Sequence, residues 1–444
     1  MYDPLVDPLP PSNATRPDSF WADGRDANHY PQLTDSMDVD VAIIGGGYTG
    51  LSAALELAQS YGVNACVLEA NQPGWGCSGR NGGFVLPGTG RLGVEQLRKR
   101  FGDSVSEALY AEYLSSINDI ANLIDAGIEC DKVCGGYLKL AHSAAAMQPL
   151  EQHAEIVTQR YSESIEVLDA QTISDTYLAG THSHGGIYYP SAFAINPWQF
   201  CQGLAQQAVN AGATIYGHSP VSHVTSTGNF HTVTTPAGTM RAKHLIVTSN
   251  AYGQRNLVPQ LKDKLFPVIS SIIVTDPLDQ QQLDELGMRD GLMTMDTRPL
   301  KYYYRLLPDN RLLFGGRGAV RGKHASADKY KVALMQGLQD TFPNLSNISI
   351  SHFWSGWVAV SYDDFPRIYH AKDERLLYSA GYCGSGLAFS VQAGKRLAQL
   401  LMEPNVLPDF PFWQSPLKTF PFAFARRPAL HAYYAWQQFK QVLS

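Results

Sequence analysis

Short apolar runs and a helical spacing near the start of the chain predict a βαβ unit. The apolar run Val39 to Ile44 is closed by the glycines Gly45 to Gly47, and Leu51 to Ala58 then places apolar residues at the spacing of an amphipathic helix. Val63 to Glu69 is a second short apolar run. A strand, a helix and a strand joined by tight turns predict the opening of a doubly wound parallel sheet.

Helices and strands continue to alternate along the chain. Residues 91–127, 145–180 and 197–210 have helical patterning, whereas 213–249 is typical of a β-meander and 265–316 alternates strand-like runs with loops. This order of elements predicts further sheet structure after the first unit.

A second strand, glycine turn and helix follow near the C-terminus. Leu376 to Ala380 predicts the strand, Gly381 to Gly386 the turn, and apolar residues from Leu387 to Leu401 recur on one face of a helix. Two such units far apart in the sequence are expected to converge on one site.

Composition and charge narrow the class of protein. The chain has 444 residues, of which 44% are apolar and 17% charged, a composition typical of a folded globular protein. A net charge of -6 without blocks of like charge excludes a nucleic-acid binder. No apolar run reaches the roughly 18 residues of a transmembrane helix, no secretory signal is visible, and the cysteines are few and irregularly spaced. We expect a cytoplasmic protein with reduced thiols and no transmembrane segment.

The segment Gly45-Gly46-Gly47-Tyr48-Thr49-Gly50 fits the dinucleotide fingerprint G-x-G-x-x-G. It follows a predicted strand and opens a predicted helix, and Glu69 and Ala70 stand at the end of the second strand. The first glycine permits a tight turn, the second lets a pyrophosphate approach the backbone, and the third lets helix and strand pack closely. The helix N-terminus favours phosphate, and Glu69 can accept hydrogen bonds from a ribose. The pattern predicts dinucleotide binding without distinguishing FAD from NAD.

A glycine-rich run from Gly74 to Phe84 begins five residues after Glu69. Its glycines would let the backbone lie against a flat ligand, and Ser78, Arg80 and Asn81 would supply donors for phosphate and ring edges. NAD-binding folds do not need such a run, so it favours FAD.

Four features together resemble the FAD-dependent D-amino-acid oxidase superfamily, and within it the gamma-glutamylputrescine oxidase branch. They are Phe20-Trp21 in the N-terminal arm, the fingerprint from Gly45, the run from Gly74, and the turn Gly381 to Gly386. The similarity extends from about Phe20 to the Arg426-Arg427 tail. The run after Gly74 is its most discriminating part, because glycine and sarcosine oxidases differ there.

The resemblance implies which residues hold FAD. The fingerprint and Glu69 would bind the ADP half, the glycine-rich run would lie along the pyrophosphate and flavin, the backbone of Val221 would meet the adenine, and the C-terminal turn would close over the pyrimidine edge of the flavin. A helix N-terminus there would stabilise the negative charge of the reduced ring. The expected cofactor-binding residues are Gly45, Gly47, Tyr48, Thr49, Gly50, Glu69, Ala70, Ser78, Gly79, Arg80, Asn81, Gly82, Gly83, Val221, Gly381, Gly384, Ser385, Gly386 and Leu387.

Three positions depart from the pattern of relatives. Ser385 stands where relatives have the His of Gly-His-Gly, and Ala388 stands where sarcosine-oxidase relatives have a substrate-binding Lys. Without that Lys no carboxylate clamp forms there, which disfavours simple α-amino acids and favours an amine whose carboxylate, if it has one, is remote. Tyr302, ahead of Pro308-Asp309, stands where relatives have the Cys that attaches flavin covalently. We therefore predict non-covalent FAD.

The fold class expected is α/β, with a Rossmann-like FAD-binding domain of the glutathione-reductase type and an interleaved antiparallel-sheet substrate domain. The expected division is an N-terminal arm at 1–38, FAD-binding segments at 39–90, 191–255 and 351–405, a helical segment with part of the substrate domain at 91–190, further substrate domain at 256–350, and a C-terminal tail at 406–444.

Two tyrosine- and tryptophan-rich segments are the candidates for substrate contact. Alternation along a strand would send Tyr303 and Arg305 to one face, which could line the pocket. Trp357, with His352 and Trp354, could supply an aromatic wall for an aliphatic amine. Core packing is the alternative for each of these residues. Tyr303, Arg305 and Trp357 are the predicted catalytic-site residues, and no metal site is predicted.

The predicted function is FAD-dependent oxidation of the C–N bond of an amine similar to gamma-glutamylputrescine. The expected partners are a small-molecule amine and either O2 or another electron acceptor, with hydrogen peroxide as a product if oxygen is used. A glycine- or D-amino-acid-type oxidase and a non-catalytic flavin-binding protein are the alternatives. The aromatic tail from Pro408 to Ser444 would either pack on its own FAD domain or touch a membrane or another subunit.

Overall fold

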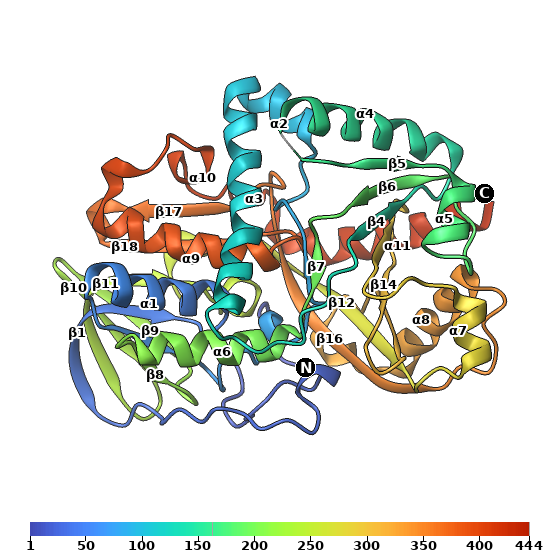
Figure 1. Ribbon diagram of the computed structural model, residues 1–444. Coiled ribbons are helices and arrows are strands. Elements are labelled where there is room, and N and C mark those ends of the chain that lie inside the picture. Colours follow the sequence, from blue (N-terminus) through green and yellow to red (C-terminus); the bar gives the residue numbers. More distant parts are fainter. Residues whose placement is uncertain (162, 444) are drawn as a thin grey trace.

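Two eight-stranded sheets organise the chain, for which the computed structural model describes residues 1–161 and 163–443 (Figure 1). In the first sheet the order β8-β2-β1-β11-β18 is parallel throughout, and β9, β10 and β17 add antiparallel pairs. The strand order reverses at β1, so the crevice at the carboxyl ends of β1 and β11 is the position where such sheets bind ligands. The strands are β1 (Ser36–Ile44), β2 (Ala65–Leu68), β8 (Thr214–Tyr216), β9 (His223–Thr227), β10 (Phe230–Thr234), β11 (Thr239–Val247), β17 (Arg367–Ala371) and β18 (Leu376–Ala380).

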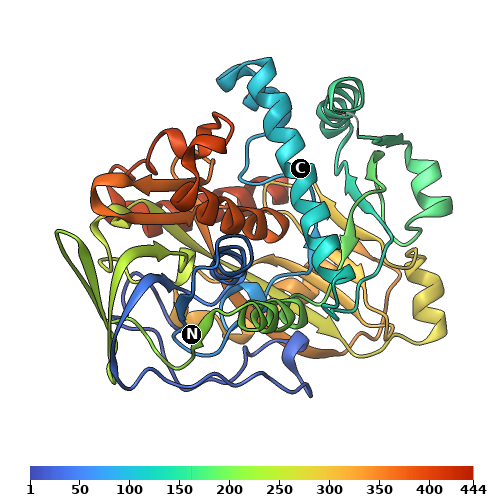
Figure 2. The ribbon, with the colours of Figure 1, turned by 60° about the vertical axis from the view of Figure 1, so that its left-hand side comes forward.

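Three helices lie together over this first sheet (Figure 2). They are α1 (Tyr48–Tyr61), α6 (Pro197–Asn210) and α9 (Leu387–Met402), and α1 packs against both of the others. The ends follow the local sequence. Gly62 ends α1 in a left-handed conformation, and the side chain of Asn196 caps α6, which has proline in its first turn.

The second sheet has the order β16-β12-β15-β14-β13-β4-β6-β5. Helix α8 (Asp328–Thr341) packs on β12 and β15, where Leu338 joins Tyr304 and Phe314 in one apolar cluster. Helices α5 (Ala170–Thr176) and α7 (Gln280–Leu286) contribute to the same cluster. The strands are β4 (Tyr137–Leu140), β5 (Glu166–Leu168), β6 (Gly186–Tyr189), β12 (Leu265–Thr275), β13 (Met293–Asp296), β14 (Tyr303–Leu306), β15 (Leu312–Arg317) and β16 (Ile350–Ser361).

The remaining elements surround the two sheets. The helical patterning at 91–127 is confirmed by α2 (Val94–Phe101) and α3 (Asp103–Asp125). That at 145–180 is confirmed by α4 (Ala144–Arg160) and α5, although β5 interrupts it by pairing with β6. The others are β3 (Phe84–Val85), which pairs with β7 (Phe193–Ala194), α10 (Pro411–Gln414) and α11 (Arg426–Leu443).

The sheets divide the chain differently from the boundary expected at residue 351. Strand β16 pairs with β12 along almost its whole length and therefore belongs to the second sheet. We propose that the third FAD-binding segment begins after β16, at Arg367. Among the residues that the structure describes, no helix combines the length and apolar character that crossing a bilayer takes.

Candidate cofactor and substrate site

A cavity of about 1010 Å³ is lined by residues of both sheets and of α1, α9 and α11. Ordinary small-molecule sites have volumes of about 300–1,000 Å³. The cavity is therefore of the size expected for a large cofactor together with a substrate.

The predicted fingerprint forms the turn between β1 and α1. Gly45 has a φ of 114°, and a Cβ at Gly50 would lie 2.0 Å from the carbonyl oxygen of Gly45, so neither position tolerates another residue. Gly47, Tyr48 and Thr49 line the cavity. The N-cap residue of α1 is Gly47, which has no side chain to cap the helix. The helix therefore presents backbone N–H groups and a partial positive charge to the cavity, which suits a phosphate.

Glu69 lies directly after β2, and the fingerprint turn fixes its carboxylate. Its Oε2 accepts a hydrogen bond from the Gly46 N–H at 2.7 Å, and its Oε1 accepts one from the Asn71 N–H at 3.1 Å. Burial raises the pKa of Glu69, and these backbone hydrogen bonds act against that rise. Each carboxylate oxygen keeps a second lone pair, so the group can still accept from a ribose hydroxyl.

The glycine-rich run folds as a loop against the start of α1, where Ser78 Oγ accepts from the Tyr48 N–H at 3.1 Å. Two of its side chains differ from expectation. Arg80 Nε donates to the Trp75 carbonyl at 2.9 Å, and Asn81 Nδ2 donates to the Cys77 carbonyl at 3.1 Å. Arg80 and Asn81 line the cavity, but these donors hold the loop in shape instead of being free for phosphate and ring edges.

Most of the residues predicted to hold the cofactor come together at the cavity. The residues that line it are Gly45, Gly47, Tyr48, Thr49, Glu69, Ala70, Ser78, Arg80, Asn81, Gly82, Val221, Gly384, Ser385, Gly386 and Leu387. Gly50, Gly79, Gly83 and Gly381 lie behind this lining, where they let backbone segments or small side chains pack closely. Val221 is in the loop between β8 and β9, ahead of the meander.

The turn from Gly381 to Gly386 joins β18 to α9 at the same cavity. Gly386 precedes the first residue of α9, and no side chain of the described residues caps this helix. Ser385, at the position of the family His, lines the cavity, whereas Ala388 is buried outside the lining. The N-terminus of α9 therefore faces the same space as that of α1.

The three predicted substrate residues do not come together. Tyr303 lines the cavity, and its hydroxyl lies 3.0 Å from Ser270 Oγ. Arg305 lies outside the lining, because its guanidinium donates to the Ile195 carbonyl at 2.8 Å and lies over a tryptophan of the N-terminal arm. Trp357 is fully buried, and its indole N–H donates to the Tyr2 carbonyl at 2.7 Å. The prediction is corrected for Arg305 and Trp357, which hold the N-terminal arm and neighbouring loops.

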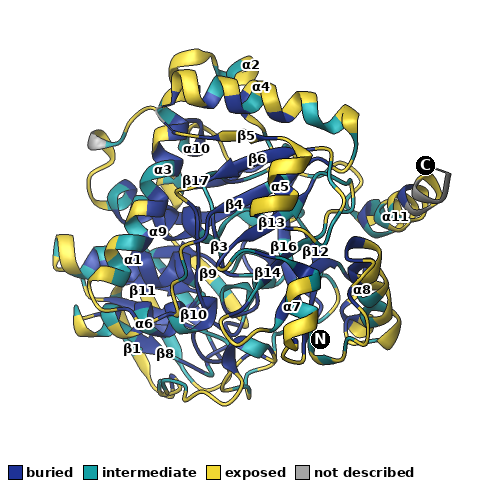
Figure 3. Ribbon diagram, turned by 45° about the vertical axis from the view of Figure 1, so that its right-hand side comes forward, coloured by how far each residue is buried: buried dark blue, intermediate teal, exposed yellow. Residues whose placement is uncertain are grey.

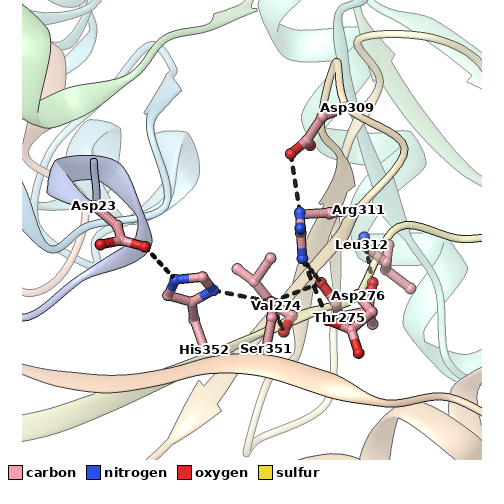
Figure 4. A network of polar contacts seen from close by, with 9 residues as sticks. All are labelled: Asp23, Val274, Thr275, Asp276, Asp309, Arg311, Leu312, Ser351 and His352. Carbon is pink, nitrogen blue, oxygen red and sulfur yellow. Dashed lines mark hydrogen bonds and ion pairs between the residues drawn. The ribbon is translucent and has the colours of Figure 1, made fainter. Parts of the chain in front are cut away.

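His352 and Trp354 also lie outside the cavity lining. His352 Nε2 is 3.3 Å from Asp23 of the N-terminal arm, and its Nδ1 is 2.9 Å from Ser351 Oγ (Figure 4). Trp354 donates its indole N–H to the Arg80 carbonyl at 2.9 Å. These two side chains join the arm and the glycine-rich loop to β16, and they form no substrate wall.

Three groups of lining residues escaped the sequence interpretation. The first follows β11, where an apolar strand that ends in small polar residues is a signal for the ligand-binding edge of a parallel sheet. The other two groups reach the cavity only through tertiary contacts, so no local pattern indicates them. The first group is Thr248, Ser249 and Asn250. The second is the basic residues Arg91, Lys139, Lys301 and Arg317, and the third is Leu430, Tyr433 and Tyr434 of α11.

Helix α11 is attached to the body at its N-terminal end. Arg426 forms an ion pair with Asp263 at 3.1 Å, Arg427 pairs with Asp3, and Leu430 packs in an apolar cluster beside the cavity. The helix then projects away from the body (Figure 3). The start of α11 thus packs on its own chain, while Tyr433, Trp436 and Phe439 have exposed side chains. Contact of the tail with a membrane or another subunit stays a prediction.

Two helix N-termini, a fixed carboxylate and a glycine-rich loop around one cavity are what binding of a flavin dinucleotide requires. A sequence profile of the family described as FAD dependent oxidoreductase matches residues 40–400. The chain belongs to this family. FAD dependent oxidoreductases of this family bind FAD, so the prediction of FAD as the cofactor is confirmed.

Similar proteins extend over most of the chain. Gamma-glutamylputrescine oxidoreductase of Escherichia coli is 31% identical over 378 residues, which are 84% of this chain and 85% of that protein. Probable oxidoreductase OrdL of Haemophilus influenzae is 30% identical over 390 residues, or 86% and 88% of the two chains. The crystal structure of glycine oxidase from Geobacillus kaustophilus has a TM-score of 0.69 at 22% identity and covers 85% of this chain and 98% of its own. The chain is an FAD-dependent oxidoreductase with the predicted α/β fold.

Acid denaturation is expected to release the FAD intact. Cys77 and Cys383 are the cysteines among the described lining residues, and burial raises the pKa of both thiols, that of Cys77 to about 11. A thiol that stays protonated is a poor nucleophile toward a flavin. Acid precipitation should therefore move all of the yellow colour into the supernatant, as measured by its absorbance. Colour that stays in the washed pellet would mean that a covalent bond forms.

Proposed function

We propose that the chain oxidises the C–N bond of an amine similar to gamma-glutamylputrescine, giving an imine that water converts to an aldehyde and ammonia. One observation carries the proposal. The cavity extends from the expected FAD-binding residues along the second sheet, where Tyr137, Tyr189, Met295 and Tyr303 line it. Such a long, largely aromatic wall suits an extended aliphatic amine better than a compact amino acid. The E. coli relative named for gamma-glutamylputrescine supports the same substrate class.

FAD, when bound, accepts the two electrons that the amine loses. The residues of the chain hold and orient the amine so that its α C–H bond points at the ring, which is a matter of position and needs no acid–base triad. A Cβ on Gly82 would lie 3.3 Å from the ring of Tyr303, so this tyrosine bounds the substrate beside the expected flavin position. Apolar surroundings lower the pKa of an amine and so favour the neutral form, whose lone pair the reaction needs.

The second product depends on the acceptor. With oxygen, the amine, O2 and water give the aldehyde, ammonia and hydrogen peroxide. The N-terminus of α9 would stabilise the negative charge of the reduced ring until the acceptor arrives. We place the reaction in the cytoplasm, and the free state of all six cysteines supports a reducing compartment.

Anaerobic mixing with candidate amines tests the proposal. We expect gamma-glutamylputrescine to bleach the flavin absorbance, whereas glycine and D-alanine leave it unchanged, because Ala388 offers no cation for a carboxylate beside the reacting carbon. Rapid bleaching by glycine or D-alanine would favour an amino-acid oxidase. A flavin that no amine bleaches would indicate a non-catalytic flavin-binding protein.

A further inference from the structure

We propose that Lys301 and Arg317, together with Lys139, form an anion-binding end of the cavity that holds a carboxylate of the substrate. The substrate class is then an amine with a carboxylate remote from the reacting nitrogen, an inference that rests on the proposed function. All three side chains line the cavity.

The register of the second sheet places Lys139 on the same face as Tyr303. Lys139, Met295 and Tyr303 are successive partners across β4, β13 and β14. Residues directly opposite each other share a face of a sheet. Adjacent strands lie about 4.8 Å apart, so the backbone of Lys139 is about 10 Å from that of Tyr303. This row leads from the expected flavin position at Gly82 to a cation at a distance that suits a long substrate.

Lys301 lies two residues before β14, and Arg317 is the last residue of the neighbouring strand β15. Tyr303 is opposite Gly315 in the antiparallel pair of β14 and β15, and continuing that register by two residues brings Lys301 opposite Arg317. Like charges in directly opposite positions destabilise a sheet. Two cations that lie close together and both line a cavity indicate a site where a bound anion would neutralise their repulsion.

In the part of the chain that the structure describes, no carboxylate forms an ion pair with these three cations. The carboxylate that influences Lys301, that of Asp296, pairs with Arg298 at 3.5 Å. Of the described lining residues, only Glu69 is acidic, and it lies on the side of the cavity that the first sheet forms. The second sheet therefore presents uncompensated positive charge.

The pKa values reflect this excess of charge. Burial and the charge of Lys301 lower the pKa of Lys139 to about 8. Partial enclosure in the cavity, together with the charges of Arg317 and Arg91, lowers the pKa of Lys301. A carboxylate bound between these groups would favour their charged forms.

One hydroxyl group adds a donor near these cations. Tyr434 Oη is buried, lines the cavity and has no hydrogen-bond partner among the described residues. Burial raises the pKa of Tyr434 while the charges of Arg317 and Arg91 act against the rise, which places this tyrosine of α11 near the cations. An ionised carboxylate accepts up to about four hydrogen bonds. The unpartnered hydroxyl of Tyr434 and the cations thus fit one kind of ligand.

The double variant Lys301→Gln/Arg317→Gln tests the inference in the FAD-loaded enzyme. We expect the KM for gamma-glutamylputrescine to rise at least about tenfold, because hydrogen bonds to charged groups contribute that much or more to binding. The KM for the analogue whose carboxylate is replaced by a carboxamide should stay unchanged. Glutarate, an unreactive dicarboxylate, serves as a binding probe by titration calorimetry, and its Kd should rise by a similar factor.

Lys262→Gln is the matched control, since Lys262 is exposed and lies outside the cavity lining. Flavin content and thermal stability of each variant show that it is folded, and the single variant Lys301→Gln serves if the double variant is not. Unchanged glutarate binding in a yellow, folded double variant would overturn the inference.

The outcomes separate this inference from the proposed function. Suppose that no amine bleaches the flavin, that the wild type binds glutarate and that the double variant does not. The anion-binding end is then supported, and the oxidation of an amine is contradicted. If the amine is oxidised and the double variant treats carboxylate and carboxamide substrates as the wild type does, the oxidation stands and the anion-binding end falls.

Discussion

Replacing Gly47 with isoleucine is expected to leave a folded protein that no longer holds FAD. Gly47 has a φ of -92°, which any residue adopts, and a Cβ there would contact only the side chain of Ser78, at 2.8 Å. The added side chain would therefore extend into the cavity in front of α1, where the phosphates of the dinucleotide are expected. We expect the Kd for FAD to rise at least about 100-fold, or about 2.7 kcal/mol, in a fluorescence titration of the apoprotein.

Thr225→Ile is the control for this experiment, because it introduces the same side chain at an exposed position of β9. It should bind FAD as the wild type does. Circular dichroism should show the same secondary structure for both variants. Wild-type affinity in Gly47→Ile would show that the phosphates do not approach the backbone at this turn.

Replacing Asp363 with alanine is expected to lower the free energy of unfolding by about 3–5 kcal/mol. Asp363 Oδ2 lies 2.7 Å from Arg367 Nη2 and 2.6 Å from Arg100 Nη2, and the side chain of Arg367 is only 2% exposed. Without the carboxylate, the charge of Arg367 stays buried and loses its counter-ion. Urea denaturation of the apoprotein at neutral pH measures the loss.

The pH dependence of this difference follows from the pKa of Asp363. Burial raises that pKa, but the hydrogen bonds and charges of Arg367 and Arg100 outweigh burial and hold it below its ordinary value. A depressed folded-state pKa contributes stability that is present above the unfolded-state pKa and is lost as the pH falls through the folded-state value. The gap between wild type and Asp363→Ala should therefore shrink in acid.

Asp373→Ala is the matched control, since Asp373 is exposed and the described residues form no ion pair with it. Its effect should stay within about 0.5 kcal/mol. Equal losses for the two variants would contradict the role of the buried pair.

The cofactor side of the molecule was predictable because its signals are local. Glycine and proline mark the ends of α6, β18 and α9, and these elements begin at the predicted residues Pro197, Leu376 and Leu387. Two fingerprint glycines have local reasons, since Gly45 has a positive φ and a Cβ at Gly50 would meet the carbonyl oxygen of Gly45. Spacing indicated the fingerprint, Glu69 and the glycine-rich run, whereas the resemblance to the oxidase superfamily implied further positions such as Val221.

The substrate side was not predictable in the same way. Strand alternation groups residues by face, but it does not say which face meets the cavity and which meets a helix or loop. Tyr303 lines the cavity, whereas the guanidinium of Arg305 donates a hydrogen bond to the backbone carbonyl of Ile195. Lys139 and Arg317 reach Tyr303 only through the pairing of β4, β13, β14 and β15, which depends on contacts between distant segments.

Strand β1 sits at the middle of the first sheet, between β2, which follows it closely, and β11, which comes much later in the chain. Strand β18 then joins β11 later still, and the turn after it completes the expected flavin site. During synthesis the ribosome therefore releases the fingerprint long before the partners that enclose it. The first sheet therefore stays incomplete until β18 has been synthesised, and the FAD site is complete only once residues 381–387 have emerged from the ribosome.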